Sequence, residues 1–137
     1  VTPKQITSLM KSMLVNAELY NLSGGIHTSA LCDRESVLIV SEDIGRHNTL
    51  DKIQGECLLR KMKTEDKLIL TSGRVSSEML RKASNMQTPV IASLTSPTVK
   101  AIQMAKDSGI SLIGYVRGGG LVVYSGAERI SGIKTGI

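Results

Sequence analysis

The feature that most constrains this chain is a threefold alternation of short apolar runs with longer amphipathic segments. The apolar runs predict strands at Val37–Ser41, Leu68–Thr71, Val90–Leu94 and Ser111–Val116. The segments between them predict helices at Arg46–Lys61, Ser77–Asn85 and Pro97–Asp107. Because strands joined through helices run parallel, with helices covering the sheet, the alternation predicts an α/β fold with a mostly parallel sheet.

The ends of the chain extend this pattern. Thr2 followed by Pro3 is typical of a helix start, and apolar residues at helical spacing predict a helix over 3–21. A strand over Ile26–Cys32 and a polar turn then lead into the next strand as a hairpin. Near the other end, three glycines precede a last strand, Leu121–Tyr124. The 137 residues carry no repeat and no second linker, so we expect a single domain, 1–137.

Helix boundaries have their own signals. Ser96 followed by Pro97 repeats the cap and proline start seen at Thr2, and Gly109 stands where a C-cap glycine belongs.

Composition excludes several classes of protein. The net charge is +5, but the basic residues are scattered among acids, and with three Tyr, no Phe and no Trp the chain offers little for stacking bases. We therefore expect no nucleic-acid partner. There is no apolar run of membrane-spanning length and no secretory signal, so we expect no membrane partner. Cys32 and Cys57 lie in apolar contexts without metal-ligand spacing, which indicates reduced thiols and a cytoplasmic protein.

Polar loops follow four of the predicted strands: SEDIGRHN, TSGRVSSE, LTSPT and YVRGGG. The carboxyl ends of parallel strands share one end of the sheet, so we expect these loops to meet there. Arg46, Arg74 and Arg117 give each of three loops a forked cation, and glycines and hydroxyls such as that of Ser76 accompany them. Together they predict a nucleotide or pyrophosphate pocket. The alternative is structural, with Ser76 and Ser96 as helix caps and RGGG as a turn, and no GxxxxGK[ST] or GxGxxG motif occurs.

Two histidines are candidates for this pocket. Arg46 and His47 occupy the first turn of a helix, where a positive charge opposes the helix dipole unless an anion or a carboxylate balances it. His27 follows two glycines that allow a close approach, and strand alternation places it opposite Ile26 and Thr28. A structural role for either histidine, with Asp43 capping the helix, is the alternative.

Five motifs occur in the order SGGIHTSAL, EDIGRHNTLDK, LTSGRVSSEM, SLTSPT and YVRGGGLVVYSGAERI. In this order and spacing, from about residue 22 to 130, the chain resembles the FdhD family of formate dehydrogenase accessory proteins.

The resemblance implies a sulfurtransferase, or sulfur carrier, that passes sulfur from a cysteine desulfurase to the molybdenum bis(molybdopterin guanine dinucleotide) cofactor before formate dehydrogenase receives it. It also implies a homodimer, and guanine nucleotides such as GDP as mimics of the bound cofactor. The family carries its persulfide on a CxxC loop, which this chain lacks, and Cys32 and Cys57 match neither family cysteine. The chain opens on a helix without an initiator methionine, so we expect the cofactor-binding C-terminal domain of a longer protein, with no catalytic residue of its own.

The resemblance implies cofactor binding at a set of six consecutive residues: Tyr115, Val116, Arg117, Gly118, Gly119 and Gly120. His27, Arg46, His47, Arg74 and Ser76 are added to the pocket from the residue-level argument above. The implied fold is a three-layer α-β-α sandwich of the cytidine deaminase-like type, with a mostly parallel mixed sheet.

Two other functions remain open. A zinc nucleobase deaminase shares that fold type, but it needs a glutamate two residues after its first ligand and a later PCxxC, whereas His27 is followed by Thr28 and Ser29 and no PCxxC occurs, so we expect no metal. A non-catalytic nucleotide-binding or docking domain is the third possibility.

Overall fold

A computed structural model of the protein describes residues 1–17 and 25–131. Its elements alternate much as the sequence pattern predicts. Three helices each follow a strand along the chain: α3 (Arg46–Arg60), α4 (Ser77–Asn85) and α5 (Val99–Ser108). The first helix, α1 (Pro3–Val15), and a short 3-10 helix, η1 (Ala127–Arg129), complete the described helical elements.

A single six-stranded sheet has the spatial order β2-β1-β3-β4-β5-β6. Its strands are β1 (His27–Cys32), β2 (Val37–Asp43), β3 (Leu68–Thr71), β4 (Val90–Ser93), β5 (Ser111–Arg117) and β6 (Gly120–Ser125). The strands β3, β4 and β5 pair in parallel, while β1 is antiparallel to both β2 and β3, and β6 is antiparallel to β5. Four strands therefore run in one direction, which confirms the mostly parallel mixed sheet.

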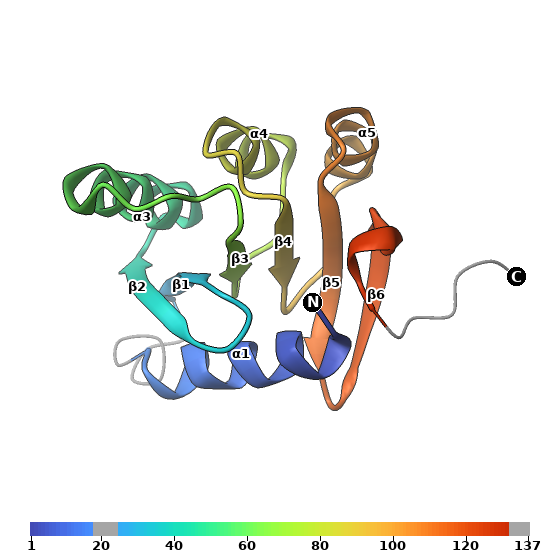
Figure 1. Ribbon diagram of the computed structural model, residues 1–137, viewed down its shortest axis with the longest axis horizontal. Coiled ribbons are helices and arrows are strands. Elements are labelled where there is room, and N and C mark those ends of the chain that lie inside the picture. The colour runs from blue at the N-terminus through green and yellow to red at the C-terminus, as the bar shows by residue number, and fades with distance from the viewer. Residues whose placement is uncertain (18–24, 132–137) are drawn as a thin grey trace, which may run out of the picture.

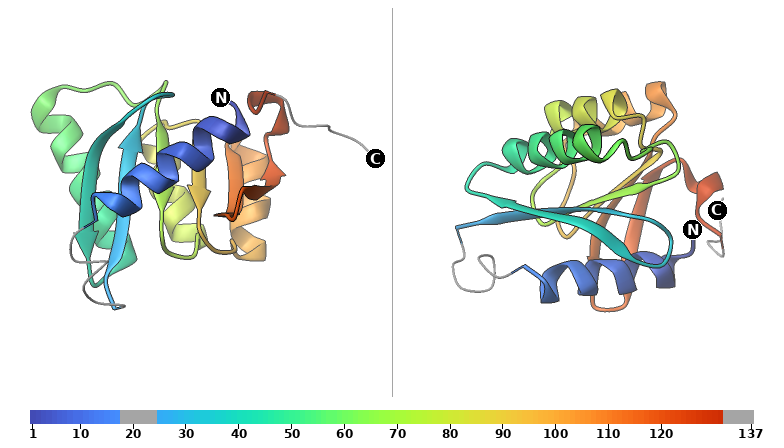
Figure 2. Two further views of the ribbon diagram at one scale, coloured as in Figure 1. Left: turned by 90° about the horizontal axis from the view of Figure 1, so that it is seen from below. Right: turned by 60° about the vertical axis from the view of Figure 1, so that its left-hand side comes forward.

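The sheet lies between two layers of helix, so the predicted three-layer α-β-α sandwich is confirmed. Helices α3, α4 and α5 cover one face, and α1 crosses the strands on the other (Figures 1 and 2). Successive strand residues alternate between two apolar cores: Ile69 and Ile91 face the three helices, whereas Leu70 and Ala92 face α1. Burial on both faces explains why these strands are continuously apolar in sequence. The narrower likeness to cytidine deaminases stays a prediction.

The first helix ends earlier than predicted. The start is as expected, since Thr2 and Gln5 form a reciprocal capping box ahead of Pro3. The helix stops at Val15, where the side chain of Asn16 donates to the carbonyl of Ser12 at 2.8 Å. The prediction of helix at 16 and 17 is wrong. Asn16 N still donates to the Ser12 carbonyl, but Ala17 N donates to the Leu14 carbonyl, and this tighter turn ends the α-helical pairing. Residues 18–21 of the predicted helix lie outside the described part of the chain.

The start of α5 also differs from the prediction. Its N-cap is Thr98, whose hydroxyl accepts from Ala101 N at 3.1 Å, so the helix begins at Val99. Pro97 instead forms a parallel bridge with Val75, which keeps the Ser96–Pro97 pair in extended backbone. The predicted C-cap is confirmed, because Gly109 takes a left-handed conformation with φ 74°.

Candidate functional site

The predicted polar loops gather at one end of the sheet, which we call the carboxyl rim. Strands β2, β3, β4 and β5 all end there, and β1 begins there because His27 pairs with Asp43. The topology thus places His27, Arg46, His47, Arg74, Ser76 and the segment from Tyr115 to Gly120 at or next to this rim.

Gly73 packs against two of the predicted residues. A β-carbon on Gly73 would lie 3.1 Å from His27 Nδ1 and 3.3 Å from Arg46 Cβ, so the loop after β3 passes between them more closely than ordinary side-chain contact allows. His27 and Arg46 are both half-buried. The structure therefore brings together three residues from three separate segments of the chain.

Buried hydroxyl groups form hydrogen bonds that hold Arg46 and Gly73 in place. Ser29 Oγ lies 2.7 Å from Thr49 Oγ1, and Thr49 donates to the Arg46 carbonyl at 2.6 Å. On the other side, Gly73 N donates to Thr71 Oγ1 at 3.2 Å, and Ser93 Oγ donates to the Gly73 carbonyl at 2.6 Å. Both backbone groups of Gly73 are thus held in place.

Sequence reasoning missed these four hydroxyl residues. A signal was present, since Ser29, Thr71 and Ser93 are polar positions at the rim ends of apolar strands. Because buried polar groups need partners, such positions indicate a hydrogen-bonded network.

The first turn of α3 presents Arg46 and His47 and contains no acid. The N-cap of α3 is Gly45, which supplies no side-chain hydrogen bond. Asp43 lies just before it and accepts from Gly45 N at 2.9 Å and from Lys52 Nζ at 2.7 Å. The Lys52 hydrogen bond, with that of Gly45, holds the pKa of the Asp43 carboxyl well below its usual range. The Asp43 carboxylate is thus already paired with Gly45 N and Lys52 Nζ.

His47 has one carboxylate neighbour and one unused nitrogen. Its Nε2 lies 3.7 Å from Glu78 Oε2 of α4, which supplies the balancing carboxylate that a basic residue in a first turn needs. Its Nδ1 is buried and has no hydrogen-bond partner in the described part of the chain. A ligand atom that pairs with Nδ1 would remove the cost of this buried polar group.

Arg74 and Ser76 have different surroundings. Arg74 is exposed in the loop that Gly73 begins. Ser76 is the N-cap of α4 and accepts from Met79 N at 3.3 Å, which is the structural role that the sequence left open for it.

The segment from Tyr115 to Gly120 forms the β5–β6 hairpin. Arg117 pairs with Gly120, and the two residues between them, Gly118 and Gly119, have φ values of 61° and 79°. A two-residue hairpin turn of this kind needs positive φ at both positions, so the turn itself accounts for both glycines. Tyr115 also has a positive φ of 52°, which is unusual for a side chain of its size, and its ring lies 5.3 Å from the Arg117 guanidinium carbon.

The hairpin turn faces α1. Arg117, Gly118 and Gly119 line a cavity of about 470 Å³ between the turn and α1, and the buried side chain of Val116 contributes to its floor. His27, Arg46, His47, Arg74 and Ser76 do not line it. The predicted pocket is therefore divided into the group around Gly73 and this cavity.

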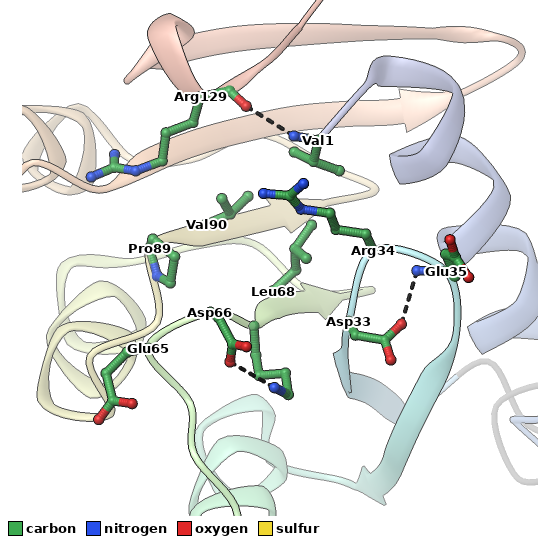
Figure 3. A pocket seen from close by; sticks show the side chains of 11 residues that line it. Val1, Asp33, Arg34, Glu35, Glu65, Asp66, Leu68, Pro89, Val90 and Arg129 are labelled. Atoms are coloured by element: carbon green, nitrogen blue, oxygen red, sulfur yellow. Dashed lines mark hydrogen bonds and ion pairs between the residues drawn. The ribbon is translucent and has the colours of Figure 1, made fainter.

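A cavity of about 780 Å³ lies at the opposite end of the sheet (Figure 3). Charges of both signs line it, including Asp66 and Lys67, which are 2.6 Å apart, and Asp33, which accepts from Glu35 N at 2.8 Å. No residue predicted from the sequence lines it.

Both cysteines are buried. Cys32 has no exposed surface, and burial, with the nearby Asp33 carboxylate, raises the pKa of its thiol to about 12. Cys57 is 5% exposed, and burial raises its pKa too. Because the thiolate is the reactive form, neither side chain suits sulfur transfer.

Two features of residues 1–17 and 25–131 bear on other functions. No three His, Cys, Asp or Glu side chains there are grouped so that they could hold a metal ion. None of the helices in those ranges has the length and apolar character that crossing a membrane requires.

Comparisons with known proteins agree with one another. The sulfur carrier protein FdhD of Bacillus subtilis (strain 168) is 46% identical over 130 residues, covering 95% of this chain and 50% of that protein. The protein of the same name from Staphylococcus aureus (strain MRSA252) is 41% identical over 130 residues, with coverages of 95% and 49%. The chain thus spans about half the length of the curated relatives it matches.

A solved structure matches as well. The crystal structure of a protein described as a formate dehydrogenase accessory protein, from Desulfotalea psychrophila, superposes with a TM-score of 0.89 at 31% identity, over 95% of this chain and 56% of that one. The family model described as the FdhD/NarQ family matches residues 1–131. The resemblance inferred from the five motifs is therefore confirmed, and the chain belongs to the FdhD/NarQ family of sulfur carriers and formate dehydrogenase accessory proteins.

Proposed function

We propose that this chain binds the molybdenum bis(molybdopterin guanine dinucleotide) cofactor as its substrate and takes part in sulfuration of that cofactor before formate dehydrogenase receives it. The observation that carries the proposal is the packing of Gly73 between His27 and Arg46 at the carboxyl rim. A tightly packed glycine, held by hydrogen bonds at both backbone groups, preorganises the two basic residues beside it.

The side chains at the rim suit a ligand that carries phosphates and guanine bases. Arg46, Arg74 and Arg117 can each donate two parallel N–H groups to a phosphate. The unpaired Nδ1 of His47 can exchange a hydrogen bond with a polar ligand atom. The basic first turn of α3 favours an anion over a cation at this position.

Sulfur delivery needs a cysteine other than those of this chain. Relatives are named sulfur carriers, whereas Cys32 and Cys57 are buried thiols with raised pKa values. We therefore assign this chain the binding of the sulfur acceptor. A cysteine desulfurase as sulfur source, formate dehydrogenase as recipient, a homodimeric state and a cytoplasmic location complete the proposal.

Titration calorimetry with GDP, which carries the guanine and the phosphates of the cofactor, tests the binding step. We expect Arg117→Ala to weaken GDP binding by about 1.5–3 kcal/mol, because it removes a charge-assisted contact. Arg34→Ala is the matched control, since Arg34 is an exposed arginine at the opposite end of the sheet. Equal affinities for the wild type and the Arg117 variant would mean that the hairpin is only a turn.

The alternative is a docking domain without a nucleotide site. A ligand that binds only the folded state raises the melting temperature, so saturating GDP should stabilise the wild type. Absence of both heat and thermal shift, with GDP at millimolar concentration, would favour the docking domain.

A further inference from the structure

We propose that the cavity between α1 and the β5–β6 turn is a diphosphate-binding site, in which Lys4 and Lys11 of α1 act together with Arg117. The proposal deepens the proposed function and rests on it for the identity of the ligand, a guanine nucleotide. Neither lysine stands in any of the five sequence motifs that define the resemblance.

One stripe of α1 faces the cavity. Lys4, Thr7, Ser8, Lys11 and Leu14 line it, at the spacing of three and four residues that places side chains on one side of a helix. The opposite wall is the turn formed by Arg117, Gly118 and Gly119. Figures 1 and 2 both show the end of this hairpin beside α1.

The charge of the cavity has one sign. Its lining contains Lys4, Lys11 and Arg117 and no acidic residue, and α1 itself has no Asp or Glu from Pro3 to Val15. Like charges gathered without a counter-charge repel one another, and Lys4 also opposes the dipole at the start of α1. A bound anion removes both unfavourable terms.

Other lysines of the protein show the contrast. Lys52, Lys67 and Lys82 each lie within 2.7 Å of a carboxylate oxygen. Within the described part of the chain, Lys4, Lys11 and Arg117 have no carboxylate within 4 Å, and the Arg117 guanidinium lies over the ring of Tyr115. These three cations therefore remain available to a ligand.

The shape and floor of the cavity define the class of ligand. Lys4 and Lys11 are two turns apart, about 10 Å along the axis, so they suit the several oxygens of a diphosphate better than one small ion. Met10, Leu14, Leu94 and Val116 give the cavity an apolar floor. A volume of about 470 Å³ with apolar lining and a few convergent charges is typical of a small-molecule site, here for a ligand with a diphosphate and a flat ring.

Inorganic pyrophosphate and GDP are the probes for the test, with binding measured by titration calorimetry. We expect the double variant Lys4→Gln, Lys11→Gln to bind both probes at least tenfold more weakly than the wild type. The control is Lys100→Gln, an exposed lysine of α5 on the other face of the sheet, which should change affinity less than twofold. Circular dichroism and the melting temperature verify that the variants fold.

A second measurement reports the site directly. Pyrophosphate should slow acetylation of Lys4 and Lys11 in the wild type, as followed by mass spectrometry, and leave Lys100 unaffected. Equal acetylation with and without pyrophosphate, or unchanged affinity in the double variant, would overturn the proposal.

The outcomes separate this inference from the proposed function. If GDP binds and only Arg117→Ala weakens it, the inference fails and the proposed function stands. If pyrophosphate binds through the lysines but GDP does not bind, the diphosphate site stands and guanine-nucleotide binding fails. If neither probe binds to the wild type, both fail.

Discussion

At the scale of single residues, the site depends on a glycine that the sequence alone does not single out. Gly73 is one of several glycines in the polar loops, and nothing in TSGRVSSE shows what lies beside it. Its neighbours His27 and Arg46 are 46 and 27 positions away in sequence. Such proximity depends on strand register, which the pattern of apolar residues constrains but does not place residue by residue.

Gly73→Ala should destabilise the fold by about 1–3 kcal/mol, because the new methyl group crowds His27 and Arg46, which must shift by a few tenths of an ångström in a buried position. Urea unfolding measures the change. Gly55→Ala is a matched control in the middle of α3, where a β-carbon would meet nothing within 4 Å. Gly55→Ala should raise the free energy of unfolding by about 0.5–1 kcal/mol, because alanine has a higher helix propensity than glycine. If both variants gained stability, Gly73 would not be sterically confined.

At the scale of elements, strand and helix positions could be predicted because both signals are local. The apolar runs predicted the positions of the parallel strands. The capping residues Thr2 and Gly109 also have the roles that the sequence predicted. The late start of α5, in contrast, has a tertiary cause. Pro97 follows Ser96 as in a helix start, but its bridge to Val75, in the loop after β3, delays α5 by two residues.

Thr98→Ala should cost about 0.5–2 kcal/mol of stability, because it removes the side-chain cap that accepts from Ala101 N. Ser96→Ala is the control, since Ser96 precedes the helix by three residues and should change stability by only a few tenths of a kcal/mol. Denaturant titration of both variants compares them. A larger loss for Ser96→Ala would restore the cap that the sequence predicted.

At the scale of the whole molecule, sheet topology explains why the candidate site could be located in part. Parallel strands bring loops that are far apart in sequence to one rim, so Arg46, Arg74 and Arg117 could be assigned to one end of the sheet. The sequence could not show that the Arg117 turn faces α1 on the other side of the sheet. The Lys4 and Lys11 stripe was therefore missed, because its partner lies more than a hundred residues away.

The burial of both cysteines is also a property of the whole fold. Cys32 and Cys57 are its two cysteines, and both are packed into apolar cores. A thiol with a pKa of about 12 is ionised at about one part in ten thousand at pH 8, so Cys32 in the folded protein should not attack a persulfide. Cys57 is shielded in the same way by its burial.

Incubating the folded chain with a cysteine desulfurase and cysteine should therefore leave both thiols without persulfide, as judged by intact mass after alkylation. The same chain unfolded in urea should react with the alkylating reagent at both cysteines, which establishes that folding, not chemistry, protects them. GDP binding by the same sample, measured beforehand, shows that the chain is native. Stable persulfide on Cys32 or Cys57 of the folded chain would make this chain a sulfur carrier in its own right.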